Sequence, residues 1–217
     1  MSFHAAITFL RELNKNNSKE WMDEHRDEYE QTKAFLIGWI EALNKKLANV
    51  DDDYCVIPGK DALTRINNNL LYHSDLPTYK DHFGIALDSP KDNGSFYLHI
   101  GLNGSFIGGG YHRLASKILS NIRDTIADSG DQLQAIITQK SFAEFFTVLE
   151  DADKLKTAPQ GFSQDHEYIE LLRLKSYTVK HSITQKEIMS DDFTDIVIDA
   201  YKKMRPFLDY LNKAAKD

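Results

Sequence analysis

The chain has 217 residues, of which 26 are lysine or arginine and 33 are aspartate or glutamate, so its formal net charge is −7. An acidic chain without clusters of basic residues is a poor candidate for general nucleic-acid binding or for binding to anionic membranes. Apolar residues make up 41%, as in ordinary globular proteins, and the length suffices for one sizeable core. We therefore expect a soluble protein with a single domain over residues 1–217, and no nucleic-acid or membrane partner.

The cysteine content and the first residues indicate the cellular compartment of the protein. Cys55 is the one cysteine in the sequence, which excludes an internal disulfide and a zinc-binding Cys-x-x-Cys pair. The start Met1–His4 lacks the basic residues and apolar run of a signal peptide. No stretch approaches the roughly 18 apolar residues that a membrane-spanning helix needs. A cytoplasmic protein is the expectation.

The N-terminal quarter is expected to form two helices. Apolar residues spaced by three or four predict a first helix over residues 3–13. Asn17 followed by Glu20 is typical of a capping box and predicts the start of a second, long helix, which Gly38 is expected to bend. One stripe of that helix is interpreted as core: Trp21, His25, Tyr29, Leu36, Ile40, Leu43 and Leu47.

A β region follows between about residues 63 and 111. Alternating apolar residues predict two strands, one around residues 83–87 and one around 96–102, joined by a loop at 89–94. Asn103-Gly104 is the preferred pair for a type I′ hairpin turn, so a third strand is expected over 105–110. If Asp88 pairs with Ser95, the apolar sets of the first two strands share one buried face. These residues are Phe83, Ile85, Leu87, Phe96, Leu98 and Ile100.

The C-terminal half reads mostly as helices. A helix is expected over about residues 114–126, with Gly130 near its C-terminal cap, followed by shorter helices at 131–138, 140–149 and 165–174. Alternation around 177–181 predicts a short strand. A last helix is expected to begin near Ser190, with Pro206 kinking or restarting it. The expected fold class is therefore α+β, with an antiparallel sheet packed against N-terminal and C-terminal helices.

The second face of the expected sheet combines missing side chains with polar ones. Gly84, Gly101 and Gly108 lie on it, and such glycines most often let a helix pack closely. The functional interpretation is a shallow groove in which the glycines leave space, and Lys80, His82, Tyr97 and His99 offer polar groups. Pairing Gly84 with His99 makes His82 and His99 diagonal neighbours. Arg65 reaches the same edge if residues 62–66 form a neighbouring strand.

The chemistry of this candidate site is that of an anion site. Lysine, arginine and protonated histidine favour phosphate or carboxylate groups, and binding is expected to strengthen below about pH 6.5 as the imidazoles charge. Two histidines without a carboxylate partner make a poor metal site, so no metal is expected. The sequence has no phosphate-binding loop and no nucleophile elbow. We expect no cofactor.

Several segments carry motifs of a known family. These are Asn16–Trp21, Tyr79–His82, Phe96–Gly110, Ala158–Phe162, Asp165–His166 and Leu172–Ser176. Together they resemble the bacterial family called domain of unknown function 2461, which also occurs in some fungi. The resemblance covers nearly the whole chain, and it implies one α+β domain with no established activity.

The chain departs from the family between Arg65 and Lys80. The resemblance implies Arg, Asp and Arg where this chain has Asn68, Asn69 and Leu71. Leu76 also stands where a lysine is usual, Pro77 comes one place early, and His112 replaces a tryptophan. These departures imply that the chain is a divergent member of the family, with an altered ligand or without catalysis.

Three function classes follow. The sequence favours a module that binds a small phosphate- or carboxylate-bearing ligand through Arg65, Lys80, His82, Tyr97 and His99. The alternatives are a metabolic enzyme that uses His99 as general acid/base, with Lys80 or Arg65 as charge clamp, and a protein-interaction domain without a small-molecule site. The missing family charges argue against the enzyme.

Overall fold

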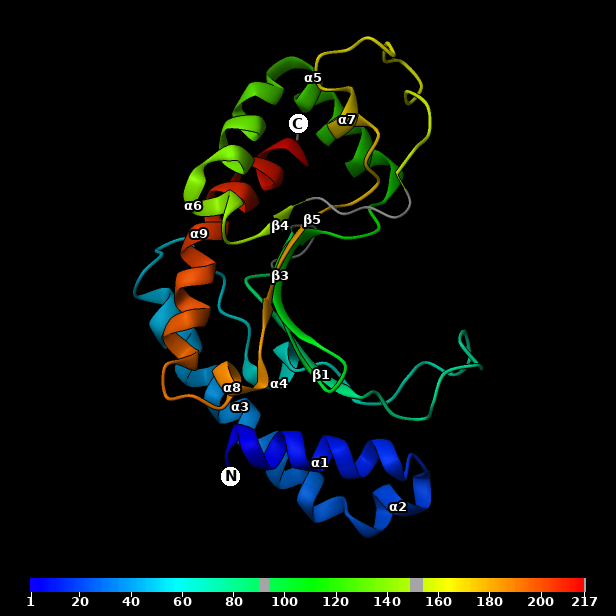
Figure 1. Ribbon diagram of the computed structural model, residues 1–217, viewed down its shortest axis with the longest axis vertical. Helices are drawn as coiled ribbons and strands as arrows, with labels where there is room; N and C mark the ends of the chain where they lie inside the picture. Colours follow the sequence, from blue (N-terminus) through cyan, green and yellow to red (C-terminus); the bar gives the residue numbers. More distant parts are fainter. Residues whose placement is uncertain (90–93, 149–153, 217) are drawn as a thin grey trace. The chain divides into compact units, whose positions relative to one another are not determined.

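The computed structural model describes residues 1–89, 94–148 and 154–216, and its α+β architecture confirms the expected fold class. An antiparallel sheet has the strand order β1-β2-β3-β5-β4 (Figure 1). The strands are β1 His82–Leu87, β2 Ser95–Gly101, β3 Ser105–Tyr111, β4 Thr147–Val148 and β5 Tyr177–Ile183. The helices are α1 Phe3–Lys15, α2 Lys19–Glu24, α3 Arg26–Ala48, α4 Gly59–Ala62, α5 Ser116–Thr138, α6 Lys140–Ala143, α7 Ile169–Leu172, α8 Gln185–Ile188 and α9 Phe193–Ala214.

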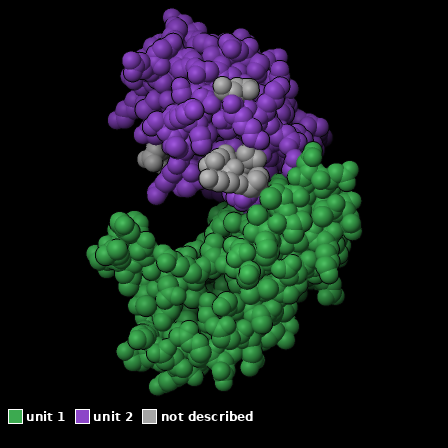
Figure 2. Space-filling view, turned by 180° about the vertical axis from the view of Figure 1, so that it is seen from behind, with its two compact units in different colours: residues 1–88, 97–107, 182–198 green, residues 89–96, 108–181, 199–217 purple. Residues whose placement is uncertain are grey.

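The chain divides into two compact units, coloured separately in Figure 2. Unit 1 comprises residues 1–88, 97–107 and 182–198, and unit 2 comprises 89–96, 108–181 and 199–217. The expectation of one domain over 1–217 stays a prediction. All five residues of the expected anion site belong to unit 1, so the site is described within that unit.

The N-terminal helices begin and end at residues other than those expected. Ser18, not Asn17, caps α2, because its hydroxyl accepts a hydrogen bond from the amide of Trp21 at 3.1 Å. The Asn17 side chain instead bonds the backbone of Tyr79, with its amide donating to the carbonyl and its oxygen accepting from the N–H. The helical run is interrupted at His25, and α3 continues through Gly38. A tertiary contact therefore decides the role of Asn17.

The expected buried face of the sheet is confirmed. All six of its apolar side chains are at most 2% exposed: Phe83, Ile85, Leu87, Phe96, Leu98 and Ile100. Within unit 2, Phe96 packs edge-on against Tyr201 of α9, with the ring centroids 5.3 Å apart. This side of the sheet thus contributes to the hydrophobic core.

The hairpin after β2 differs from the expected type I′ turn. That turn needs positive φ at both central residues, but Gly104 has φ +128° whereas Asn103 is not in the left-handed region. The Ser105 hydroxyl closes the turn, accepting from the Gly101 amide at 3.0 Å and donating to the Gly101 carbonyl at 3.2 Å. Asn103 donates its side-chain amide to Asp81. A side-chain contact therefore replaces the local turn preference.

In the C-terminal half, the expected strand and last helix are confirmed, and two of the shorter helices have other boundaries than expected. Helix α5 runs from Ser116 to Thr138 with non-helical backbone at Ser129. Two helical stretches of α5 meet at Ser129, so the expected helix end near Gly130 and the expected helix at 131–138 are confirmed. A Cβ on Gly130 would lie 2.5 Å from the Tyr168 ring. The helix expected at 140–149 ends at Ala143, and residue 149 lies outside the described residues. The helix expected at 165–174 is shorter and corresponds to α7.

Two further features complete the C-terminal half. Residues 147–148 form β4, which pairs antiparallel with β5, Thr147 opposite Lys180. Pro206 lies within α9, which continues to Ala214 without restarting. The β1–β2 connection at 89–94 falls largely on residues 90–93, outside the described residues. Within the described ranges, every helix is too short or too polar to cross a membrane.

Candidate functional site

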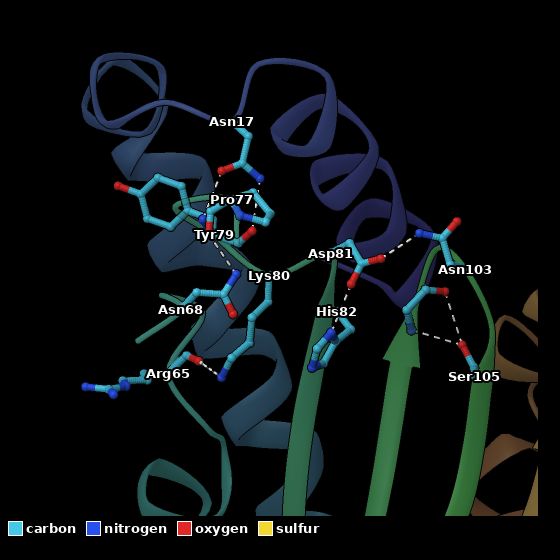
Figure 3. A network of polar contacts seen from close by, with 11 residues as sticks. Asn17, Arg65, Asn68, Pro77, Tyr79, Lys80, Asp81, His82, Asn103 and Ser105 are labelled. Carbon is cyan, nitrogen blue, oxygen red and sulfur yellow. Dashed lines mark hydrogen bonds and ion pairs between the residues drawn. The ribbon is translucent and has the colours of Figure 1, made fainter. Parts of the chain in front are cut away.

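An extended segment runs beside the outer edge of β1 and carries Arg65. The Thr64 amide donates to the Gly84 carbonyl and the Lys80 amide donates to the Ile66 carbonyl, both at 2.8 Å. Antiparallel bridges join Leu63 to Ile85 and Asn67 to Tyr79. The expected neighbouring strand at 62–66 is therefore present as two bridges and not as a regular strand. It brings the backbone carbonyl of Arg65 to the Lys80 ammonium, and the Arg65 side chain points away from Lys80 (Figure 3).

Lys80 and Arg65 form a pair of like charges. The half-buried Lys80 ammonium donates to the Arg65 carbonyl oxygen at 2.7 Å. Burial, and then the charge of Arg65, lower the pKa of Lys80. Among the described residues, no carboxylate lies within ion-pair distance of either side chain. The two cations therefore repel each other without a neutralising acidic residue.

His82 and His99 meet across β1 and β2, as the diagonal pairing predicted. Their rings stack with centroids 4.0 Å apart. The Phe106 ring also stacks on the His99 ring, with centroids 4.9 Å apart. The Leu102 amide donates to the Asp81 carbonyl at 3.2 Å, which agrees with the register that placed Asp88 opposite Ser95. Burial, and then the neighbouring His82, lower the pKa of His99 to about 4. The His99 imidazole is therefore neutral at pH 7.

Sequence reasoning missed Asp81, which is a carboxylate partner of His82. One oxygen of Asp81 lies 3.0 Å from His82 Nδ1, and the other accepts from the Asn103 amide at 2.7 Å. Burial alone would raise the pKa of Asp81, but these hydrogen bonds from His82 and Asn103 outweigh it and lower the pKa. The expectation of two histidines without a carboxylate was wrong, because the chain bends at Asp81 and no longer alternates its side chains.

Side chains of the sheet itself occupy the space that two of the glycines provide. A Cβ on Gly84 would lie 2.3 Å from the Tyr97 hydroxyl, and one on Gly101 would lie 2.9 Å from His99 Nε2. The expectation that these glycines leave a gap was therefore wrong at both positions. They let Tyr97 and His99 lie flat over the strands, and burial raises the pKa of Tyr97.

Hydrogen-bonding capacity remains on this face. Within the described residues, no side chain or backbone group bonds the His99 ring nitrogens or the Tyr97 hydroxyl. No cluster of three or more metal-ligating side chains occurs in the described ranges. The absence of a metal and of a cofactor stays a prediction. We call Arg65, Lys80, His82, Tyr97 and His99 the polar edge cluster.

The low pKa of His99 predicts a loss of stability in acid. The unfolded chain protonates this residue near the ordinary histidine pKa of 6.5, but the folded chain does so near 4, so the unfolded state gains protons first as the pH falls. The free energy of unfolding should drop by roughly 1–2 kcal/mol through this window, after discounting for solvent screening. Equilibrium unfolding in urea at several pH values between 7 and 4 measures this drop in the free energy of unfolding.

The matched variants for this measurement are His99→Gln and the exposed His112→Gln. The first removes the titrating group and should flatten the pH dependence between about pH 6.5 and 4, whereas the second should follow the wild type. An unchanged slope in His99→Gln would contradict the assignment.

The segment that departs from the family resemblance has its own local structure. Asn68, where the family resemblance implies an arginine, donates its side-chain amide to the Pro77 carbonyl at 2.8 Å, and its backbone amide donates to the Thr78 carbonyl at 3.0 Å. These bonds close the loop over residues 69–77. Leu71 in that loop is 86% exposed. Arg65 and Lys80 lie at the base of the loop.

The comparisons with known proteins agree with the resemblance in the sequence. No curated protein and no solved structure matches the chain. The profile of a family of conserved hypothetical proteins, DUF2461, matches residues 5–210. That range includes every residue of the polar edge cluster and most of the helices on both sides of it. The chain therefore belongs to the DUF2461 family.

Proposed function

We propose that this protein binds a small anionic ligand, one that bears a phosphate or carboxylate, at the polar edge cluster. The observation that carries the proposal is the half-buried Lys80 ammonium: it bonds the Arg65 carbonyl, is close enough to feel the charge of Arg65, and like Arg65 has no ion pair to a described residue. A half-buried ammonium costs free energy unless it is paired. A bound anion would remove both this cost and the repulsion from Arg65.

The donors of the two cations suit an anion. An ammonium has three donors, of which Lys80 uses one on the Arg65 carbonyl, and a guanidinium has five in a fork that matches phosphate and carboxylate. Asp81, next to Lys80 in the chain, is an acid that would oppose an anion. Its two oxygens are already engaged by His82 and Asn103, and this lessens the repulsion.

Neutral groups complete the proposed site. His99 carries one donor and one acceptor in its neutral form, and Tyr97 adds a hydroxyl. The sequence-based expectation that binding strengthens below about pH 6.5 does not extend to His99, because its pKa is about 4. The relevant charge is on Lys80, whose lowered pKa makes binding weaken at alkaline pH before an ordinary lysine would titrate.

Titration of the protein with inorganic phosphate and with citrate, followed by isothermal calorimetry at about pH 7, tests the proposal. Lys80→Gln should raise the Kd about tenfold or more, because a hydrogen bond to a charged group contributes about 1.5–3 kcal/mol. Lys60→Gln, which removes an exposed lysine of α4 in the same unit, is the control and should bind as the wild type does. Equal affinities in all three proteins, or no binding by the wild type, would reject the proposal.

A general acid/base role for His99 is the second candidate, and one observation supports it. Its ring nitrogens accept or donate no hydrogen bond within the described residues, so they are open to a substrate. A pKa of about 4 makes the imidazole a weak base at neutral pH, however, since an efficient general base has a pKa near the working pH. Binding without catalysis is therefore the function that we favour.

A further inference from the structure

A row of aromatic rings crosses three strands of the sheet in unit 1. The rings of His82, His99 and Phe106 come from β1, β2 and β3 and stack on one another, with interplanar angles of 28° and 8°. The centroid of the Tyr97 ring lies 6.1 Å from that of Phe106. His82, at one end of the stack, follows Lys80 by two residues (Figure 3). All four aromatic residues are partly exposed, and we call them the aromatic row.

Polar groups with unused hydrogen-bonding capacity lie at the aromatic row. Two hydroxyls converge over Gly84: a Cβ there would lie 2.3 Å from the Tyr97 hydroxyl and 2.8 Å from Thr64 Oγ1. Within the described residues, neither of these hydroxyls nor the ring nitrogens of His99 form a hydrogen bond. Thr64 belongs to the extended segment beside β1 that also accepts the hydrogen bond of the Lys80 ammonium. The unused groups therefore reach from the rings towards that cation.

This combination suits a planar heterocycle better than a phenyl ring or a simple anion. Nucleic-acid bases stack on aromatic side chains, and one such contact strengthens binding by about 10-fold or more. Hydroxyls and a neutral imidazole supply donors and acceptors, which match the ring nitrogens and exocyclic groups of a heterocycle. A phenyl ring would stack as well, but it would cover these polar groups without bonding them, which costs free energy. The ammonium of Lys80 adds the preference for a negative charge.

We propose that the anionic ligand of the polar edge cluster carries a planar heterocycle, as a nucleoside monophosphate does. The inference rests on the proposed function, because the phosphate pairs with Lys80. The heterocycle lies against the aromatic row, and its polar edge bonds the Tyr97 hydroxyl. A single nucleotide, unlike a nucleic acid, needs no extended basic surface, so the net charge of −7 agrees with this ligand.

Calorimetry on the full chain at about pH 7 compares adenosine monophosphate, ribose 5-phosphate and adenosine. The nucleotide should bind about 10-fold or more tightly than ribose 5-phosphate, because it alone of the two has a base to stack. It should also bind about 10-fold or more tightly than adenosine, which lacks the phosphate. Equal affinities for the nucleotide and ribose 5-phosphate would overturn this inference and leave the anion site intact. Failure of both phosphates to bind, or adenosine binding as tightly as the nucleotide, would reject the anion site as well.

Tyr97→Phe separates recognition of the base from folding, because it keeps the ring and removes a hydroxyl that bonds no described residue. Without a ligand, its melting temperature should equal or exceed that of the wild type. Its Kd for adenosine monophosphate should rise about 3- to 10-fold, whereas its Kd for ribose 5-phosphate should not change. Tyr72→Phe, at a residue of the same unit that is 76% exposed, is the control and should bind both as the wild type does. An unchanged Kd for the nucleotide in Tyr97→Phe would contradict the proposed contact.

Discussion

Replacing Leu98 with alanine is expected to lower the free energy of unfolding by about 2–5 kcal/mol, as large-to-small changes in a core do. Leu98 lies in the middle of β2 and is 0% exposed. Its neighbours on the buried face, among them Ile85 and Ile100, are 0% exposed as well. The truncated side chain would leave a cavity that this close-packed face cannot fill without moving strands. Equilibrium unfolding in urea measures the loss.

Leu71→Ala is the matched control for this prediction. It makes the same chemical change at a residue that is 86% exposed, so the free energy of unfolding should stay within about 0.5 kcal/mol of the wild type. A Leu98→Ala protein as stable as Leu71→Ala would show that the alternating residues of β2 do not face the core.

The second large effect is expected at Gly110 in β3. Gly110 has φ +114°, which L-amino acids rarely adopt, and a Cβ there would lie 2.0 Å from the Tyr177 carbonyl oxygen. Because the clash is with backbone, no side-chain rotation relieves it. Gly110→Ala should therefore destabilise the protein by about 3 kcal/mol or more, the sum of backbone strain and overpacking. Thermal and urea unfolding measure this change.

Gly38→Ala is the matched control, since the same methyl group is added where it meets no neighbour. Gly38 is exposed on α3, and a Cβ there would have no atom within 4 Å beyond the backbone of its own helix turn. The replacement should stabilise the protein by about 0.5–1 kcal/mol, because alanine favours the helix. If Gly110→Ala unfolds at the same urea concentration as Gly38→Ala, β3 does not approach β5 at Gly110.

The sequence predicted those elements whose pattern has a strong period. The alternation in residues 83–87 and 96–100 placed two strands, their shared buried face and their register, because a one-residue slip would turn every apolar side chain outwards. The same register predicted the contact of His82 with His99. The helices at both ends followed from apolar residues three and four apart. These features depend on neighbours within one element or one strand pair.

The features that sequence reasoning missed are set by residues far apart in the chain. Asn17 has the character of a helix cap, but its side chain bonds Tyr79, 62 residues later. Asn103 favours a type I′ turn, yet it donates to Asp81 across the sheet edge. In each case a tertiary contact outweighed a local preference of about 1 kcal/mol.

The sequence by itself determined the α+β class, the buried face of the sheet, the family and the contact of His82 with His99. Only the tertiary structure decided how the residues of the polar edge cluster are charged and paired. Burial keeps His99 neutral down to about pH 4, the bend at Asp81 gives His82 a carboxylate, and the segment beside β1 brings the Arg65 carbonyl to Lys80. A protonation state depends on burial and on the nearest charges in space, and neither is encoded in spacing along the chain.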